Sequence, residues 1–306
     1  MTATRMNIGL IGCGLWGANI LRDLVQLGCG VHVSDIDETC RSSAKSLGAQ
    51  STCTLIQDLP QVQGYVVATP ATTHREVIEQ LIPNRVPIFT EKPFTTDIAS
   101  AKRILEAGKG LVFVMHVWRY HPGIEMLAAI ARSRELGRVE MLRTTRTNWT
   151  SPRRDIDSIW TLAPHDLSIA LEILGHIPEP RFAVAERNGG QPCGLLGILG
   201  ESPRVVLEVS SRYGDRRREV RLHCADGVAV LQGEGTGQLV VTRGRTTDRE
   251  LEPAREHRSL EDTPALYREL SAFVGHLKGG PPPKSSAEEG LMTVTAMVRL
   301  RSLAGL

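Results

Sequence analysis

A glycine-rich segment at residues 12–17, GCGLWG, constrains the fold of this chain more than any other feature. It fits the pattern G-x-G-x-x-G, and it lies between an apolar run at residues 7–11 and helically spaced apolar residues at 16–27. In such a unit the first glycine permits a tight turn, the second lets the backbone approach a pyrophosphate, and the third allows the helix to pack closely on the strand. The pyrophosphate then faces the helix N-terminus. The segment therefore predicts a dinucleotide-binding strand–turn–helix.

An acidic residue at the end of the second strand indicates which dinucleotide is bound. Asp35 follows the apolar run at residues 31–34 and comes about 20 residues after the glycines. A carboxylate at this point accepts hydrogen bonds from the adenosine ribose and repels a 2′-phosphate, so we expect NAD in preference to NADP. Asp37 is a rival for the ribose, but it precedes a helix expected at 38–47 and Asp is a favoured N-cap. A strand–turn–helix that binds no nucleotide is the open alternative.

Short apolar runs alternate with helical patterns over the first part of the chain. This alternation predicts a doubly wound parallel sheet, the Rossmann fold, in a domain spanning residues 1–118. The expected strands are residues 7–11, 31–34, 65–69, 87–90 and 111–115, and the expected helices are 16–27, 38–47, 73–82 and 96–107.

The pattern changes after His116 to many short strands separated by Gly and Asp pairs. Turns are expected at Gly189-Gly190, Gly214-Asp215 and Asp226-Gly227. We therefore expect residues 119–306 to form an α+β domain with a mostly antiparallel, open-faced sheet. Its expected strands are residues 139–148, 181–186, 195–199, 204–212, 218–224, 228–232 and 238–242, and its expected helices are 122–134, 164–174, 264–278 and 286–302.

The composition limits the kinds of partner that this chain is expected to bind. Lys and Arg number 36 against 34 Asp and Glu, so a net charge of +2 gives no electrostatic reason to bind nucleic acid. No run of about 18 apolar residues exists, so no membrane span is expected. The N-terminus lacks a secretory pattern, and we expect a cytoplasmic protein.

The six cysteines are scattered and lack the spacing of metal ligands, so we expect reduced thiols and no metal site. They are Cys13, Cys29, Cys40, Cys53, Cys193 and Cys224.

Lys92 is the first catalytic candidate. It follows the strand expected at 87–90, at the carboxyl edge where open α/β sheets bind ligands. An ammonium group there can hold a substrate hydroxyl and stabilise the alkoxide that develops as hydride departs. The alternative is a Glu-Lys pair exposed on a surface loop.

Four motifs together resemble the glucose–fructose oxidoreductase/inositol dehydrogenase/MocA (Gfo/Idh/MocA) family. They are residues 12–17, Ala68-Thr69-Pro70 with His74, Glu91-Lys92-Pro93, and a later histidine beside an Asp. The resemblance covers essentially the whole chain. It implies a Rossmann domain with an open-faced sheet domain, NAD or NADP as cofactor, and ring hydroxyls of sugars or inositols as substrates. It also implies that Lys92 is catalytic, that Thr69, Pro70 and Glu91 lie along the cofactor, and that the chain forms a homodimer or homotetramer.

One stretch is similar to the branch that acts on nucleotide-linked sugars: Arg146-Thr147-Asn148 with residues 157–166, DSIWTLAPHD. His165 stands where the family keeps an acid/base histidine, expected at a helix start, and imidazole titrates near working pH. Four residues earlier the family commonly has Asp, but this chain has Thr161, whose hydroxyl cannot supply negative charge. Asp157, Asp166 or Glu91 are possible replacements.

The sequence thus predicts an NAD(H)-dependent oxidoreductase that moves a hydride to or from a ring hydroxyl or ketone of a sugar-like substrate, with a nucleotide-linked sugar as the narrower expectation. The alternatives are an inositol, aldose or dihydrodiol dehydrogenase of the same fold, or an inactive NAD-bound sensor. Catalytic candidates are Lys92 and His165. Cofactor-binding candidates are Gly12, Gly14, Leu15, Trp16, Gly17, Asp35, Thr69, Pro70, His74, Glu91 and Lys92. Substrate-binding candidates are Arg119, Tyr120, Arg146, Asn148, Trp160 and Thr161, with His116, Arg153 and Arg154 as weaker ones.

Overall fold

The computed structural model describes residues 5–150, 155–233, 238–244 and 254–306, and the chain divides into two compact units. The first unit comprises Met1–Val117 and Ala265–Val294, and the second comprises Trp118–Pro264 and Thr295–Leu306. In the described residues, no helix is both long and apolar enough to cross a membrane.

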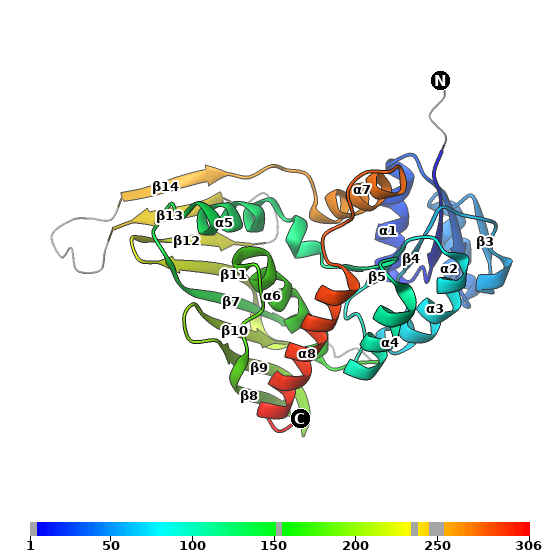
Figure 1. Ribbon diagram of the computed structural model, residues 1–306. Coiled ribbons are helices and arrows are strands. Elements are labelled where there is room, and N and C mark those ends of the chain that lie inside the picture. The colour runs from blue at the N-terminus through cyan, green and yellow to red at the C-terminus, as the bar shows by residue number, and fades with distance from the viewer. Residues whose placement is uncertain (1–4, 151–154, 234–237, 245–253) are drawn as a thin grey trace. The chain divides into compact units, whose positions relative to one another are not determined.

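The first unit is built on a six-stranded parallel sheet in the order β3-β2-β1-β4-β5-β6, of which β3, β4 and β5 are labelled in Figure 1. This is the doubly wound order, in which the order of the strands reverses between β1 and β4, so the predicted Rossmann fold is confirmed. Buried apolar residues on both faces of the central strands form its core. The strands are β1 (Asn7–Ile11), β2 (Gly30–Ser34), β3 (Ser51–Cys53), β4 (Gly64–Val67), β5 (Ile88–Glu91) and β6 (Val112–Met115), and the helices are α1 (Leu15–Gln26), α2 (Glu38–Ser46), α3 (His74–Leu81) and α4 (Ile98–Gly108).

Two late helices belong in whole or in part to this first unit, although residues 119–306 were expected to form one continuous domain. They are α7 (Ala265–Leu277) and the first part of α8 (Ala287–Leu303). Phe273 of α7 stacks on Phe89 of β5 with ring centroids 4.9 Å apart. A Cβ on Gly64 would lie 2.9 Å from the Leu277 side chain. The side chains of α7 therefore complete the core of the parallel sheet.

The second unit is built on an eight-stranded sheet in the order β14-β13-β12-β11-β7-β10-β9-β8. Among the described strands, β7 and β10 are the only pair that runs parallel, so the predicted mostly antiparallel sheet is confirmed. The helices α5 (Pro122–Ser133) and α6 (Ser158–Leu174) pack on it. The strands are β7 (Val139–Trp149), β8 (Pro180–Asn188), β9 (Gln191–Leu199), β10 (Arg204–Ser210), β11 (Arg212–Cys224), β12 (Gly227–Gln232), β13 (Gln238–Arg243) and β14 (Ala254–Ser259).

The hairpin turn expected at Gly214-Asp215 is wrong. β11 continues through both residues and pairs with β7, and the register shifts between Arg212 and Arg217, which pair with Trp149 and Thr147. The residues between Arg212 and Arg217 thus form an irregular part of β11 and not a hairpin turn. Gly and Asp suit an irregular strand as well as a turn, so the local sequence did not distinguish the two.

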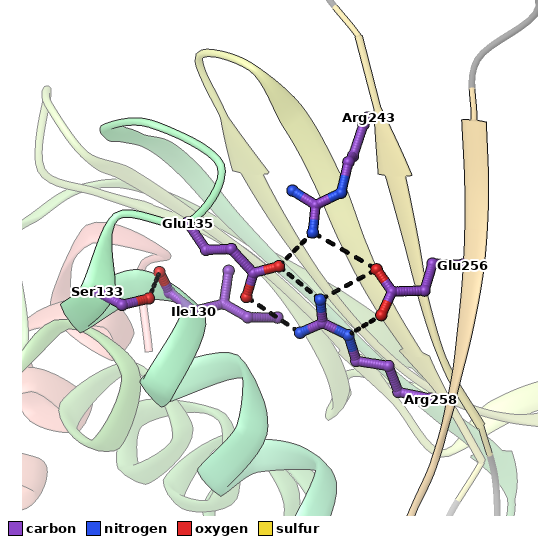
Figure 2. A network of polar contacts seen from close by, with 6 residues as sticks. All are labelled: Ile130, Ser133, Glu135, Arg243, Glu256 and Arg258. Carbon is purple, nitrogen blue, oxygen red and sulfur yellow. Dashed lines mark hydrogen bonds and ion pairs between the residues drawn. The ribbon is translucent and has the colours of Figure 1, made fainter.

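An ion-pair network connects the end of α5 with the last two strands of the sheet (Figure 2). Arg258 of β14 donates to Glu135 at 3.1 Å and to Glu256 at 2.8 Å. Arg243 of β13 also donates to Glu135. These hydrogen bonds, with that from Arg258 the strongest influence, lower the pKa of Glu135 to about 2. The network therefore connects the edge of the sheet to the residues that follow α5.

Candidate cofactor and catalytic site

The three glycines of the fingerprint differ in what a side chain would meet. Gly12 has a φ of +86°, and a Cβ there would lie 2.8 Å from the carbonyl oxygen of Ala68. A Cβ on Gly17 would lie 2.3 Å from the carbonyl oxygen of Gly12, whereas a Cβ on Gly14 would meet none of the described residues within 4 Å. The fold itself thus requires Gly12 and Gly17, and it leaves space above Gly14 that a ligand can occupy.

The N-terminus of α1 suits an anion. Gly14 is the N-cap and supplies no side-chain acceptor to the amides of the first turn, which have no partner within a helix. These amides lie at the positive end of the helix dipole. Beside them, the side chain of Leu15 is 97% exposed and that of Trp16 is 45% exposed. Amide donors, open space and apolar neighbours together fit the pyrophosphate of a dinucleotide.

Asp35 is held rigidly at the carboxyl end of β2. Its Oδ2 accepts the backbone N–H of Cys13 at 2.6 Å, and its Oδ1 accepts that of Asp37 at 2.9 Å. The carboxylate thereby contacts the fingerprint turn, and it has lone pairs left for ribose hydroxyls. Asp37 instead caps α2 and accepts the N–H of Thr39 at 2.7 Å, a bond that lowers the pKa of Asp37. Its predicted role as a helix cap is confirmed.

His74 connects the loop after β4 with the loop after β5. It is fully buried at the start of α3. Its Nδ1 lies 2.9 Å from the carbonyl oxygen of Pro93, and its Nε2 lies 3.0 Å from that of Thr69. Thr73 donates a further hydrogen bond to the carbonyl of Pro70 at 2.8 Å. The two loops that carry the predicted cofactor and catalytic residues are therefore fixed to each other.

Glu91 and Lys92 stand at the end of β5. Glu91 is buried, and its carboxylate accepts the indole N–H of Trp16 on one oxygen. Its other oxygen accepts the backbone N–H of Lys92 at 3.1 Å. Lys92 itself is partly buried. The fingerprint helix, Glu91 and the candidate catalytic lysine thus form one connected group in the first unit.

In the second unit, α6 begins earlier than predicted. Asp157 caps it by accepting the N–H groups of Ile159 and Trp160 at 3.0 and 3.1 Å, and Pro164 lies inside the helix. The helix continues through the proline because it is buried on almost every side. His165 therefore lies in the middle of α6 and not at a helix start, and its side chain is partly exposed.

Arg146 lies in a buried ion pair beside His165. Its Nε donates to Oδ2 of Asp166 at 2.8 Å, and the two side chains are only 4% and 1% exposed. Its guanidinium also lies 4.4 Å above the ring of Trp118. The sequence indicates Arg146 as a substrate-binding candidate, and in the structure its Nε is engaged by Asp166 of α6.

Thr161 directs its hydroxyl into its own helix, where it donates to the carbonyl of Asp157 at 3.1 Å. The three carboxylates considered as replacements for the expected Asp all have partners. Asp157 pairs with Arg301 at 2.6 Å as well as capping α6, Asp166 pairs with Arg146, and Glu91 holds Trp16. All three are therefore engaged by other residues, but Oδ1 of Asp166 is buried without a hydrogen bond in the described part of the chain, so Asp166 stays a candidate replacement.

The remaining substrate candidates are largely internal. Arg119 pairs with Glu172 at 2.9 Å, and Tyr120 and Trp160 are buried. The Oδ1 atom of Asn148 is buried and makes no hydrogen bond within the described part of the chain. His116 is buried against Ser285 at 3.0 Å. Arg153 and Arg154 lie outside the described residues.

The contacts that hold Glu91 beside Trp16 and Arg146 beside Asp166 were not predicted from the sequence. Trp16 and Glu91 are 75 residues apart, and no local pattern records that they meet. Arg146 and Asp166 lie on a strand and a helix, where opposite charges at candidate positions were the only signal. Among the described residues, no group of three or more His, Cys, Asp or Glu is arranged to hold a metal ion.

The fold and the fingerprint define the first unit as a dinucleotide-binding Rossmann domain. Residues 6–117 match the family described as an oxidoreductase family with an NAD-binding Rossmann fold. This match agrees with the Gfo/Idh/MocA resemblance that the sequence motifs indicate.

Individual relatives extend the likeness beyond this domain. An inositol 2-dehydrogenase of Saccharopolyspora erythraea is 30% identical over 56% of this chain, and the match covers 54% of that protein, about half its length. An inositol 2-dehydrogenase of Streptomyces avermitilis is 27% identical over 60% of this chain, and the match covers 63% of that protein's length. An inositol 2-dehydrogenase of Acidothermus cellulolyticus is 28% identical over 98% of this chain and 94% of its own length.

Solved structures share the fold over the whole chain. UDP-N-acetylglucosamine 3-dehydrogenase from Acidithiobacillus ferrooxidans has a TM-score of 0.84 at 23% identity, covering 98% of this chain and 97% of that one. Levoglucosan dehydrogenase, in complex with NADH and levoglucosan, has a TM-score of 0.85 at 16% identity, covering 99% and 98%.

Proposed function

We propose that this chain is an NAD-dependent dehydrogenase that acts on a ring CH–OH group of a sugar-like substrate. The observation that carries the proposal is the connected group of the first unit. A fingerprint turn suited to a pyrophosphate lies next to Glu91, and Glu91 holds the backbone of Lys92. The relatives named inositol 2-dehydrogenase support this class of reaction.

In the first unit, Lys92 would donate a hydrogen bond to the substrate hydroxyl oxygen and stabilise the alkoxide that forms when the hydroxyl proton leaves. In the second unit, His165 is the candidate for a general base, since a neutral imidazole accepts a proton near pH 7. Bound NAD would supply the hydride acceptor for the carbon that bears this hydroxyl, so that the alcohol is oxidised to a ketone. Asp35 would hold the adenosine ribose and disfavour NADP.

Within this class we favour a nucleotide-linked sugar as the substrate. The support is the stretch from Asp157 to Asp166 and the similarity in fold to UDP-N-acetylglucosamine 3-dehydrogenase. A free inositol or anhydrosugar is the second candidate, favoured by the inositol 2-dehydrogenases and by the equal similarity in fold to levoglucosan dehydrogenase. An NAD-bound sensor without catalysis is the third, because Thr161 replaces the expected carboxylate.

A substrate panel tests this proposal. Purified protein is incubated with NAD and, separately, UDP-N-acetylglucosamine, UDP-N-acetylglucosaminuronic acid, myo-inositol, glucose and levoglucosan, and NADH fluorescence is recorded. The proposal expects turnover of at least one compound that Lys92→Met abolishes. The matched control is Lys102→Met, because Lys102 is exposed on α4. NAD binding without turnover of any compound favours the sensor.

We also propose that the outer face of the second sheet forms a homodimer contact. Phe182, Val184 and Leu196 are large apolar side chains exposed on β8 and β9, and Val184 pairs directly with Leu196. Adjacent exposed apolar side chains are typical of an interface. Light scattering of Phe182→Glu should show dissociation to the monomer, whereas Met292→Glu, exposed on α8, should leave the assembly unchanged. A wild-type monomer would refute this contact.

A further inference from the structure

A single side chain connects the phosphate-binding turn with the catalytic lysine. Trp16 is the second residue of α1, the helix whose first turn faces the proposed pyrophosphate position. Its indole N–H donates to one oxygen of Glu91, and the other oxygen of Glu91 accepts the backbone N–H of Lys92. The two ends of the connection are thus the backbone that would bind phosphate and the backbone that carries the lysine.

The surroundings of the two groups indicate that this contact matters beyond packing. Trp16 is 45% exposed, so burial alone does not explain a tryptophan here. Glu91 is 9% exposed, and a buried carboxylate depends strongly on its hydrogen-bond donors. An indole N–H given to a carboxylate is a charge-assisted bond, which is stronger than a neutral one. The contact therefore fixes the rotamer of Glu91.

The carboxylate can satisfy both donors only in one orientation. Oε1 faces Trp16 and Oε2 faces the Lys92 amide, so rotation of the group toward one donor loses the other. The carbonyl of Pro93, one residue beyond Lys92, is held at 2.9 Å by buried His74. The backbone is consequently held on both sides of Lys92, by Glu91 at its amide and by His74 at the carbonyl of Pro93. Of these two contacts, the one through Glu91 extends to the fingerprint turn.

We infer that Trp16 is a positioning residue that couples occupation of the phosphate-binding turn to the orientation of Lys92. The inference rests on the proposed function. A dinucleotide that binds the first turn of α1 orders the backbone of Trp16, and through Glu91 it orders the lysine backbone. Because such coupling is reciprocal, loss of the indole N–H weakens the response of Lys92 to the cofactor and weakens cofactor binding slightly.

The first test is Trp16→Phe, which keeps an aromatic ring and removes the N–H donor. We expect kcat to fall about tenfold, the effect of losing one hydrogen bond to a charged group, while the calorimetric Kd for NAD rises only about twofold to threefold. The matched control is Tyr65→Phe, which removes a hydrogen bond to Asn84 of 3.1 Å elsewhere in the same unit. Unchanged kcat in Trp16→Phe overturns the inference.

A double-mutant cycle with Glu91→Gln tests whether the two residues act together. Gln offers one acceptor oxygen, so it cannot accept from both donors as the carboxylate does. If Trp16 acts through Glu91, the double variant should lose no more kcat than the more impaired single variant. Independent, multiplicative losses would contradict the connection, even where both single variants are slow.

Hydrogen exchange of the Lys92 amide gives a readout that needs no turnover. In the protein without cofactor we expect this amide to exchange about tenfold faster in Trp16→Phe than in the wild type, because Glu91 loses its fixed orientation. Equal exchange rates overturn the inference. A wild type that turns over none of the panel refutes the proposed dehydrogenase, while the exchange rates still decide whether Trp16 positions Glu91 and Lys92.

Discussion

Two glycine substitutions only three residues apart should separate the two roles of the fingerprint: Gly14→Ala should weaken cofactor binding, and Gly17→Ala should lower stability. In Gly14→Ala the new methyl group meets no described residue within 4 Å, and φ at this position is −66°, which L residues adopt readily. Reduced freedom of the unfolded chain stabilises the variant by about 0.4–1 kcal/mol. The poorer N-cap offsets this by a similar amount. The free energy of unfolding should therefore stay within about 1 kcal/mol of the wild type.

The same methyl group should impair cofactor binding. It occupies the space above the fingerprint turn and keeps a pyrophosphate from reaching the amides of α1. Hydrogen bonds to a charged group contribute about 1.5–3 kcal/mol each, so the loss of one raises the Kd for NAD about 10-fold to 100-fold. Titration calorimetry with NAD measures this directly.

Gly17→Ala is the counterpart. Its methyl group would lie 2.3 Å from the carbonyl oxygen of Gly12, a backbone atom that cannot move independently. Overpacking of this kind costs about 1–3 kcal/mol, so urea unfolding should show a clear loss of stability. A Gly14→Ala variant that binds NAD as the wild type does, or a Gly17→Ala variant of unchanged stability, would refute the reasoning.

Three further outcomes are expected from the described contacts. The pKa of Glu135 lies below its unfolded value, so the stabilisation that its carboxylate provides is present above about pH 5 and disappears toward pH 2. Because the site is partly exposed, Glu135→Gln should lower the free energy of unfolding by about 1 kcal/mol at pH 7. At pH 2 urea titrations should show no measurable difference from the wild type. Asp166→Asn should cost about 3–5 kcal/mol in the same assay, because Arg146 remains buried without its counter-charge, and a loss below about 1 kcal/mol would argue against a buried pair. Asp35→Ser should reduce the preference for NAD over NADP about tenfold by calorimetry, and an unchanged preference would exclude Asp35 from the ribose contact.

Local chemistry made the first unit predictable. The fingerprint glycines, the cap at Asp37 and the start of α8 each depend on residues close in sequence. At α8, Ser286 and Glu289 exchange hydrogen bonds of 3.1 and 3.4 Å between side chain and backbone, which is the pattern of a capping box. Such features need no knowledge of distant segments.

The elements that were missed lack a local signal. β14 has the sequence AREHRS and exposes most of its side chains, so no apolar alternation marks it as a strand. β3 has only three residues. The sequence predicts a start of α6 at Pro164, and proline does favour a first turn, yet burial of the helix on almost every side outweighs that preference.

The site was predictable residue by residue but not contact by contact. The sequence marked Trp16, Glu91 and Arg146 as candidates, but it did not indicate that Trp16 bonds to Glu91 or that Arg146 pairs internally with Asp166. Those pairings depend on which strands and helices become neighbours, and single-residue patterns do not contain that information.

Transfer of deuterium from substrate to NAD tests the proposed reaction at the reacting atoms. Whichever compound of the panel is turned over is prepared with deuterium on the reacting carbon, and the NADH formed is analysed by mass spectrometry. We predict one deuterium per NADH in the wild type and no product with Lys92→Met. Reduced cofactor without deuterium, or no reduction with any compound of the panel despite NAD binding, would contradict hydride transfer by this protein.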